Sequence, residues 1–139
     1  MTRALELAKA AGAKRAIPLK VSGAFHSPLM RVAEAGLAAQ LDGVSISAPA
    51  FPIYSNVTAQ PVTDPAEARR LLVKQLTSPV RWTQSVRAMA DAGAAHMIEL
   101  GPGSTLVGLI KRIDKAVRTT SAGTAKDVES FGDATVGSA

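Results

Sequence analysis

His26 is the residue of this chain best suited to chemistry, because of what surrounds it. It follows a strand-like run over residues 17–21 and precedes an apolar-periodic helix predicted over 28–42. Ser27 is a favourable N-cap, and Pro28 fits the first helical turn, where its missing N–H costs nothing. The partial positive charge of a helix N-terminus disfavours imidazolium, so we expect a neutral ring that can accept a proton. Such a base suits the activation of a hydroxyl nucleophile, although a histidine that fills a polar turn fits the same spacing equally well.

Other polar residues have simpler interpretations. His96 has no second ligand at metal-binding spacing, so we interpret it as a strand-edge histidine and expect no metal site. Asp64 could be the acid of a catalytic triad, but a helix-capping role already explains it. The turn over residues 101–104 could cradle an anion at the N–H groups of the helix that follows it. Without a P-loop lysine or a G-x-G-x-x-G pattern, chain reversal is the better interpretation of that turn.

Composition and charge exclude several classes of function. The 139 residues include no cysteine and carry a formal net charge of +5. Lys and Arg are dispersed without interleaved aromatic residues, so no nucleic-acid partner is expected, and a solvated basic face is the default. No run approaches the roughly 20 apolar residues that span a bilayer, and no signal peptide follows Met1, so no membrane partner is expected. The absence of cysteine suits a reducing cytoplasm, where we expect this protein to act.

Apolar periodicity predicts the helices that must position His26. They are expected over residues 2–11, 28–42, 64–76, 79–92 and 105–114. Their predicted N-terminal caps include Asp64, Ser78 and Ser104, which are residue types that accept a hydrogen bond from the first helical turn. Trp82 lies on an apolar stripe, so we interpret it as a core side chain rather than a stacking platform.

Short strands are predicted between these helices. They are expected over residues 17–21, 51–55, 96–100 and 117–120. Pro52 indicates that the second strand begins late or lies at a sheet edge. Residues 59–63 are predicted to form a turn, and the small polar residues from Gly123 onward predict a mobile tail. The alternation predicts an α/β fold with a partial, mainly parallel sheet and helices on its faces, from which further strands are missing.

Four stretches of this sequence agree, in order, with one family. The run V-S-G-A-F-H-S-P-L-M over residues 21–30 resembles the histidine motif of malonyl-CoA:acyl-carrier-protein transacylases and of the related acyltransferase domains of polyketide and fatty-acid synthases. Y-S-N-V-T over 54–58 resembles the S-N-V-T segment of that family, and K-Q-L-T-S-P-V-R-W over 74–82 resembles its Q-L-x-x-P-V-x-W segment. E-L-G-P-G over 99–103 is similar to its E-x-G-P-G turn. The resemblance extends to about residue 121 and rests on all of these motifs at compatible spacing.

The resemblance implies a division of the chain. Residues 1–22 would be the end of a ferredoxin-like small subdomain, residues 23–122 the C-terminal part of the α/β acyltransferase subdomain, and residues 123–139 the mobile tail. In that family a serine on a G-H-S-x-G elbow and an arginine that receives the malonyl carboxylate lie upstream of the histidine motif. This chain contains no G-x-S-x-G. We therefore expect the C-terminal part of a transacylase, with its N-terminal half missing and no complete active site.

The resemblance also implies roles for particular residues. His26 matches the base that removes the proton of the serine, and Gln75 matches the residue whose backbone carbonyl orients that histidine. Phe25 occupies the position where the family tends to carry phenylalanine for malonyl and a smaller residue for methylmalonyl. Asn56, at a strand end, is expected to belong to the substrate-binding part of the site, and satisfaction of a turn is the alternative.

The implied function is transfer of a malonyl group from coenzyme A to the phosphopantetheine thiol of acyl carrier protein in fatty-acid biosynthesis. The implied partners are malonyl-CoA, acyl carrier protein and the missing half of the enzyme, and no cofactor is implied. A positive surface would attract the acidic carrier and the phosphates of coenzyme A. The alternatives are a non-catalytic module that binds acyl carrier protein, an acyltransferase fragment of a polyketide synthase, and an unrelated α/β domain that binds a metal or ligand. The last predicts metal retention by His26 and His96, which the predicted strands and helices separate.

Overall fold

The structure, a computed structural model, describes residues 2–18 and 21–136. The helices are α1 (Thr2–Ala10), the 3-10 helix η1 (Pro28–Ala33), α2 (Glu34–Asp42), α3 (Pro65–Lys74), α4 (Trp82–Asp91), α5 (Thr105–Ile113) and α6 (Ala125–Val136). The strands are β1 (Ile53–Tyr54), β2 (Pro61–Val62), β3 (His96–Leu100) and β4 (Arg118–Ala122). None of the helices in this described part has the length and apolarity needed to cross a lipid bilayer.

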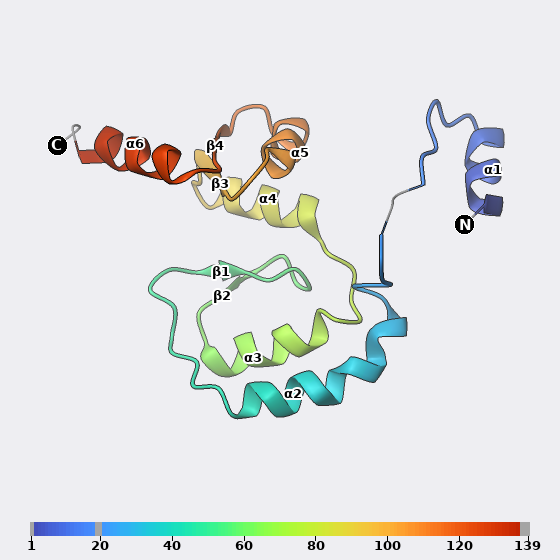
Figure 1. Cartoon of the computed structure of the whole chain (residues 1–139), viewed down its shortest axis with the longest axis horizontal. Helices are drawn as coiled ribbons and strands as arrows, with labels where there is room; N and C mark the ends of the chain where they lie inside the picture. Colours follow the sequence, from blue (N-terminus) through green and yellow to red (C-terminus); the bar gives the residue numbers. More distant parts are fainter. Residues whose placement is uncertain (1, 19–20, 137–139) are drawn as a thin grey trace.

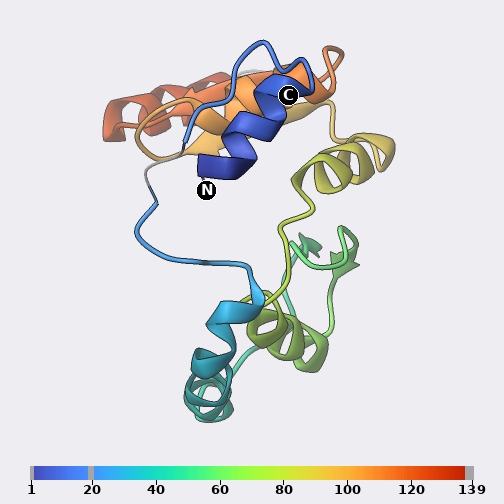
Figure 2. The same cartoon turned by 90° about the vertical axis from the view of Figure 1, so that its right-hand side faces the viewer.

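After α1, the elements form two groups along the chain (Figure 1). The hairpin unit, residues 28–77, contains η1, α2, the β1–β2 hairpin and α3. The parallel unit, residues 82–136, contains α4, β3, α5, β4 and α6. Figure 2 shows the same separation from the side, with residues 78–81 connecting the units. The chain therefore forms two small packing units rather than one continuous sheet.

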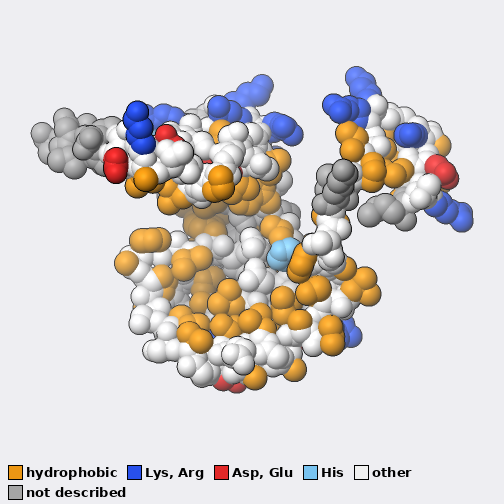
Figure 3. All heavy atoms as spheres, viewed as in Figure 1, with side chains coloured by type: hydrophobic (Ala, Val, Ile, Leu, Met, Phe, Trp, Pro, Cys, Tyr) orange, Lys and Arg blue, Asp and Glu red, His pale blue; other side chains and the backbone are white. Residues whose placement is uncertain are grey.

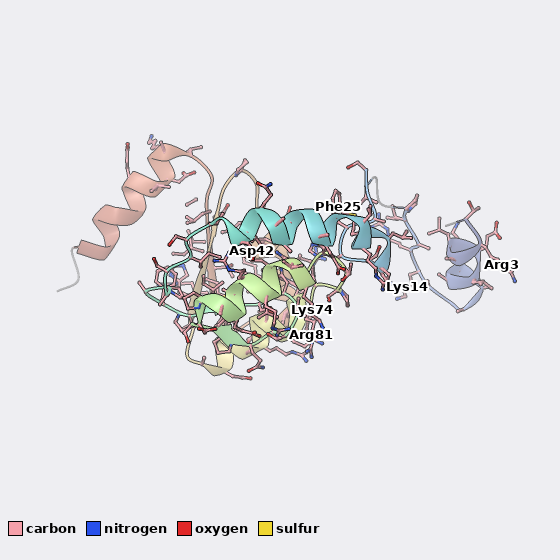
Figure 4. All side chains as sticks on the ribbon, turned by 90° about the horizontal axis from the view of Figure 1, so that it is seen from below. Arg3, Lys14, Phe25, Asp42, Lys74 and Arg81 are labelled. Atoms are coloured by element: carbon pink, nitrogen blue, oxygen red, sulfur yellow. The ribbon has the colours of Figure 1, made fainter. Side chains whose placement is uncertain are left out.

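Antiparallel packing of two helices builds the hairpin unit. α2 and α3 lie side by side and run in opposite directions (Figures 1 and 4). α3 begins after Asp64, whose carboxylate accepts the backbone N–H of Glu67 at 2.7 Å, with Pro65 in the first turn. This confirms the predicted start of that helix. The antiparallel arrangement brings the C-terminal end of α3 next to the start of η1, where His26 lies.

The parallel unit contains a β-α-β motif. β3 and β4 pair in parallel, with His96 opposite Arg118, and α5 connects them. Their positions confirm the strands predicted over 96–100 and 117–120 to within two residues. The core consists of Val86, Ile110 and Val117, against which Trp82, Met89, Ala90, Met97 and Ile113 pack. Trp82 is therefore a core side chain, as predicted.

α1 ends where glycine allows it to end. Gly12 has a φ of +89°, in the left-handed region, and the N–H of Ala13 donates to the carbonyl of Ala8 at 3.0 Å. This confirms the helix predicted over 2–11. No residue of α1 is buried, and Leu7 on its apolar face is 60% exposed. In Figure 1 the helix lies apart from both units.

The helix predicted over 28–42 differs in its first half. It begins as the 3-10 helix η1, because the N–H of Met30 donates to the carbonyl of Ser27, only three residues back, at 3.0 Å. It continues as α2 from Glu34. No residue of η1 or α2 is fully buried. Of the predicted apolar face, Leu29 and Val32 are exposed, whereas Ala33, Leu37 and Leu41 are partly buried.

The helix predicted over 79–92 begins later than expected. Its first residue is Trp82, and the predicted cap, Ser78, lies outside it. The N–H of Arg81 donates to the carbonyl of Asn56 at 2.9 Å, so the segment before the helix is bound to the hairpin unit instead of joining α4. Arg81 occupies the cap position without a side-chain bond to the first turn.

The strand predictions are right for the parallel unit and incomplete elsewhere. β1 begins after Pro52, as that residue predicted, but its partner β2 lies within residues 59–63, where only a turn was expected. The two strands pair antiparallel, so mainly parallel pairing describes β3 and β4 alone. Proline tolerates an edge position such as Pro61 because it has no N–H to pair. In the strand predicted over 17–21, residues 17, 18 and 21 lie in no strand, and residues 19–20 lie outside the described residues.

Residues 125–136 form α6, where a tail was expected from the composition. The helix starts with a reciprocal cap. The N–H of Asp127 donates to Thr124 Oγ1 at 3.2 Å, and the N–H of Thr124 donates to Asp127 Oδ2 at 2.8 Å. Residues 137–139 lie outside the described residues.

Candidate active site

His26 lies in a tight turn that the surrounding side chains hold. Its φ is +59°, a left-handed conformation that histidine adopts more readily than most non-glycine residues. Ser27 Oγ donates to the carbonyl of Ala24 at 2.7 Å and accepts the N–H of Leu29 at 3.3 Å. The predicted cap therefore exists, and its hydroxyl also closes the turn that precedes the helix. This geometry fixes the direction in which the imidazole leaves the backbone.

The imidazole contacts the end of α3. Nδ1 of His26 lies 2.8 Å from the backbone oxygen of Gln75, across 49 positions of sequence. A carbonyl oxygen can only accept a hydrogen bond, so Nδ1 carries the hydrogen and Nε2 of the neutral ring keeps its lone pair. Within residues 2–18 and 21–136, Nε2 has no hydrogen-bond partner. The half-buried ring thus presents a proton acceptor on the side away from Gln75.

The carbonyl that receives this bond belongs to a helix terminus. Gln75 is the C-cap of α3, and its own N–H still bonds to the last turn of that helix. Carbonyls at a helix C-terminus lack intrahelical partners and carry the negative end of the helix dipole. The oxygen of Gln75 also receives the N–H of Ser78 at 3.4 Å. A partial negative charge therefore faces the N–H of Nδ1.

The side chain of Gln75 makes a second contact. Its Oε1 accepts a hydrogen bond from Asn56 Nδ2 at 3.1 Å, between partly buried groups. Asn56 follows β1, and its carbonyl accepts the N–H of Arg81. His26, Gln75 and Asn56 are therefore joined in one hydrogen-bonded series. The structure brings together three of the residues that the sequence had singled out for the site.

One further pair near the site was not anticipated from the sequence. Thr77 Oγ1 donates to Glu34 Oε1 at 2.7 Å, joining the turn after α3 to the first residue of α2. No periodic pattern or motif links these residues. Their pairing follows only from the antiparallel packing of α2 and α3.

Phe25 does not share the series of contacts made by His26. Its side chain is 63% exposed, and Figure 4 shows it near the chain that enters η1. The ring lies over Gly23, where an added Cβ would come within 2.8 Å of the ring edge. A cavity of about 210 Å³ is lined in part by Asn56 and Gln75. Its lining residues are Ile53, Tyr54, Ser55, Asn56, Val62, Ala68, Leu71, Leu72 and Gln75.

The remaining polar candidates are bound in structural contacts. His96 Nε2 lies 2.8 Å from Thr120 Oγ1, and Arg118 donates to His96 Nδ1 at 3.0 Å, so the ring bridges β3 and β4. Asp64 caps α3, as described above. The neighbouring Glu67 binds Arg70, and that hydrogen bond lowers the pKa of the Glu67 carboxyl.

The helix that follows the turn over residues 101–104 is capped by a carboxylate of the chain itself. The carboxylate of Glu99 accepts the N–H groups of Leu106 at 3.1 Å and Val107 at 2.9 Å, at the N-terminus of α5. Ser104, the predicted cap, makes no side-chain bond to that helix. Glu99 was missed as a cap because it precedes the helix by more than a turn. Its carboxylate occupies the site where an external anion could otherwise bind.

Comparison with known proteins gives a consistent result. No protein-family model matches the chain. The chain is 42% identical, over 126 residues, to the malonyl CoA-acyl carrier protein transacylase of Bacillus subtilis. The aligned region is 91% of this chain and 40% of that protein. The acyl-carrier-protein-S-malonyltransferase of Bartonella henselae superposes with a TM-score of 0.88 at 37% identity, over 96% of this chain and 42% of that one.

The chain is homologous to a part of these transacylases. It spans about two fifths of the length of the curated relatives it matches. A further match is a malonyl-transacylase solved in complex with its type II polyketide acyl-carrier protein, with a TM-score of 0.83 and 38% identity over 95% of this chain and 43% of that one. The transacylase homology confirms the family resemblance and the α/β class inferred from the sequence motifs.

Proposed function

We propose that this chain supplies the general base of a malonyl-CoA:acyl-carrier-protein transacylase. The observation that carries the proposal is the 2.8 Å contact between His26 Nδ1 and the Gln75 carbonyl. That contact holds the ring in the tautomer whose Nε2 can accept a proton, which general-base catalysis requires. The nucleophilic serine belongs to a segment outside these residues, since the chain holds no G-x-S-x-G.

The proposed reaction has two transfers, with His26 active in both. Nε2 takes the proton of the serine hydroxyl while the serine oxygen attacks the malonyl thioester carbonyl. The C–S bond breaks, and the imidazolium returns the proton to the departing coenzyme A thiol. His26 then removes the proton of the carrier's phosphopantetheine thiol, which attacks the malonyl ester. The serine leaves and recovers its proton from the ring.

Gln75 replaces the carboxylate that orients many catalytic histidines. A carbonyl stabilises imidazolium less than a full negative charge does, because a charge–dipole contact is weaker than a charge–charge contact. Its position at the end of α3 adds the partial charge of the helix C-terminus. Gln75 therefore both fixes the tautomer and partly stabilises the protonated ring.

Phe25 is proposed to set acyl selectivity. It adjoins His26 in sequence, and its large exposed ring would face the acyl group that the serine carries. A bulky ring excludes the extra methyl of methylmalonyl by steric contact, worth roughly 10- to 200-fold in selectivity. The carrier itself could serve fatty-acid or polyketide synthesis, since one matched relative is described with a polyketide carrier.

The proposal is tested by supplying the missing part. The chain is co-expressed with the serine-bearing segment that precedes the matched region in the B. subtilis relative, and malonyl transfer from coenzyme A to acyl carrier protein is measured. Transfer is expected only when both parts are present. His26→Ala should then reduce the transfer rate about 10²- to 10⁴-fold, the usual contribution of a general base.

His96→Ala is the matched control, because His96 is the other histidine of the chain and lies in the parallel unit. Unchanged transfer by His26→Ala, in a preparation that depends on both parts, would reject the assigned base. Binding of acyl carrier protein by the chain, without transfer in the combined preparation, would instead favour a non-catalytic carrier-binding module. In the same assay, Phe25→Ser should raise the rate with methylmalonyl-CoA relative to malonyl-CoA.

A further inference from the structure

The residue that orients His26 is itself held from two sides. The backbone oxygen of Gln75 binds the imidazole at 2.8 Å, and its side-chain Oε1 binds Asn56 Nδ2 at 3.1 Å. A contact at each end restrains the residue more than either contact alone. This matters because Gln75 follows the last turn of α3, and helix ends fray.

Asn56 is well suited to provide such a restraint. Its carbonyl accepts the N–H of Arg81 at 2.9 Å, which joins the end of β1 to the connector before α4. Two backbone hydrogen bonds close the hairpin turn. The N–H of Ser55 donates to the carbonyl of Gln60 at 3.1 Å, and the N–H of Ala59 donates to the carbonyl of Ser55 at 2.8 Å. The amide of Asn56 is thus presented by backbone that is bound on both sides.

The same contact changes the role expected for Asn56. One of the two N–H groups on Asn56 Nδ2 is already donated to Gln75 Oε1, within a partly buried contact. The amide is therefore oriented by a contact within the protein, toward the residue that holds His26. The geometry favours an indirect role over the substrate-binding role expected from the sequence.

We infer that Asn56 is a positioning residue, which fixes the Gln75 carbonyl and through it the tautomer and direction of His26. The inference rests on the proposed function for its catalytic consequence, but the hydrogen-bonded series exists independently of any reaction. Loss of the Asn56 contact should let Gln75 turn, so that Nδ1 of His26 loses its fixed acceptor. The ring would then populate the other tautomer, whose Nε2 cannot accept a proton.

The first test reads the ring directly, without activity. The full chain is labelled with ¹⁵N, and long-range ¹⁵N–¹H correlations give the ratio of the two His26 tautomers, with His96→Gln used to assign the signals. Asn56→Leu should lower the ratio of the Nδ1–H to the Nε2–H tautomer about fivefold, the factor expected for loss of one neutral hydrogen bond. Gln60→Leu, an exposed substitution in the same hairpin, is the matched control and should leave the ratio unchanged.

A second pair of variants keeps the test decisive if Asn56→Leu fails to fold. Gln75→Leu keeps the carbonyl but removes the side-chain contact, so it should shift the ratio as Asn56→Leu does. Asn56→Asp should retain the ratio, because the Gln75 amide can turn and donate to the carboxylate. A tautomer ratio in folded Gln75→Leu or Asn56→Leu equal to that of the unsubstituted chain would overturn the inference.

The second test separates positioning from substrate binding in the combined enzyme. Asn56→Leu should lower kcat about fivefold and leave KM for malonyl-CoA unchanged, whereas loss of a substrate contact would raise KM. A raised KM with unchanged kcat would overturn the inference in favour of direct binding. If His26→Ala has no effect on transfer but Asn56→Leu still shifts the tautomer, the proposed function fails while the positioning of the ring stands.

Discussion

Among single residues, Glu99 shows how a motif acid can be structural. Its carboxylate accepts two backbone N–H groups at the start of α5, which otherwise lack partners inside the helix. Negative charge at a helix N-terminus also interacts favourably with the helix dipole. The first residue of the E-x-G-P-G turn is therefore explained by capping, without a ligand.

Replacement of Glu99 by alanine is expected to destabilise the chain. Loss of both N–H contacts and of the favourable charge should lower the free energy of unfolding by about 1 kcal/mol. Ser104→Ala is the matched control and should change it little, because Ser104 makes no side-chain cap bond. Denaturant unfolding of both variants measures the difference, and a larger loss for Ser104→Ala would contradict the assignment.

The candidate site was predictable where motifs carry it and not elsewhere. The contact between His26 and the carbonyl of Gln75 was anticipated because both residues lie in stretches that resemble one family. The bond between Glu34 and Thr77 was not, since it depends on how two helices pack across 43 positions. Similarly, the sequence places Asn56 at a strand end but cannot say that its amide faces Gln75.

Among the elements, α6 depends on a carboxylate at its start. Asp127 accepts a hydrogen bond from the hydroxyl of Thr124 and from the N–H groups of Thr124 and Gly123, and these bonds lower its pKa. A group with a lowered pKa contributes stability above its ordinary pKa, which is 3.8 for this aspartate. That stability is lost as the pH falls through the lowered value.

Helix α6 is therefore expected to fray in acid. Its amide resonances should keep helical shifts above the ordinary pKa of 3.8 and lose them as the pH falls below it and the Asp127 carboxylate takes up a proton. Asp127→Asn should remove most of this pH dependence, since its side chain still accepts a hydrogen bond but does not titrate. An equal acid transition in both proteins would assign the effect to another group.

Element prediction succeeded where the signal is local. Asp64 and Pro65 mark the start of α3, and Gly12 marks the end of α1, because caps act within one turn. The start of α4 was misplaced because the N–H of Arg81 is used by Asn56, which lies 25 positions earlier. α6 was missed because its small polar residues resemble a tail, although its capping pair is local.

At the scale of the whole molecule, large apolar side chains lie open to solvent. Leu29 and Val32 of η1 are 77% and 90% exposed, and Phe51 before β1 is 74% exposed. Figure 3 shows hydrophobic side chains gathered over the face of the hairpin unit. Extended apolar surface of this kind marks a contact with other protein. The chain spans about two fifths of the length of the relatives it matches, and we propose the serine-bearing segment of the proposed enzyme as the cover.

Addition of the serine-bearing segment should stabilise this chain. At a concentration about 100-fold above Kd, binding to the folded chain contributes about 2.7 kcal/mol, which corresponds to a rise in Tm of about 10 °C. Binding of an apolar fluorescent dye to the chain should fall in parallel as the exposed surface is covered. Unchanged Tm and dye binding at that concentration would show that the open faces serve another contact.

The left-handed backbone at position 26 also restricts which residues could replace His26 while the turn keeps its shape. Asparagine and aspartate tolerate such a backbone, and each is one nucleotide change from a histidine codon, whereas β-branched residues are strained there. Related proteins that still fold but have lost this histidine are therefore expected to carry asparagine or aspartate at this position more often than valine or isoleucine.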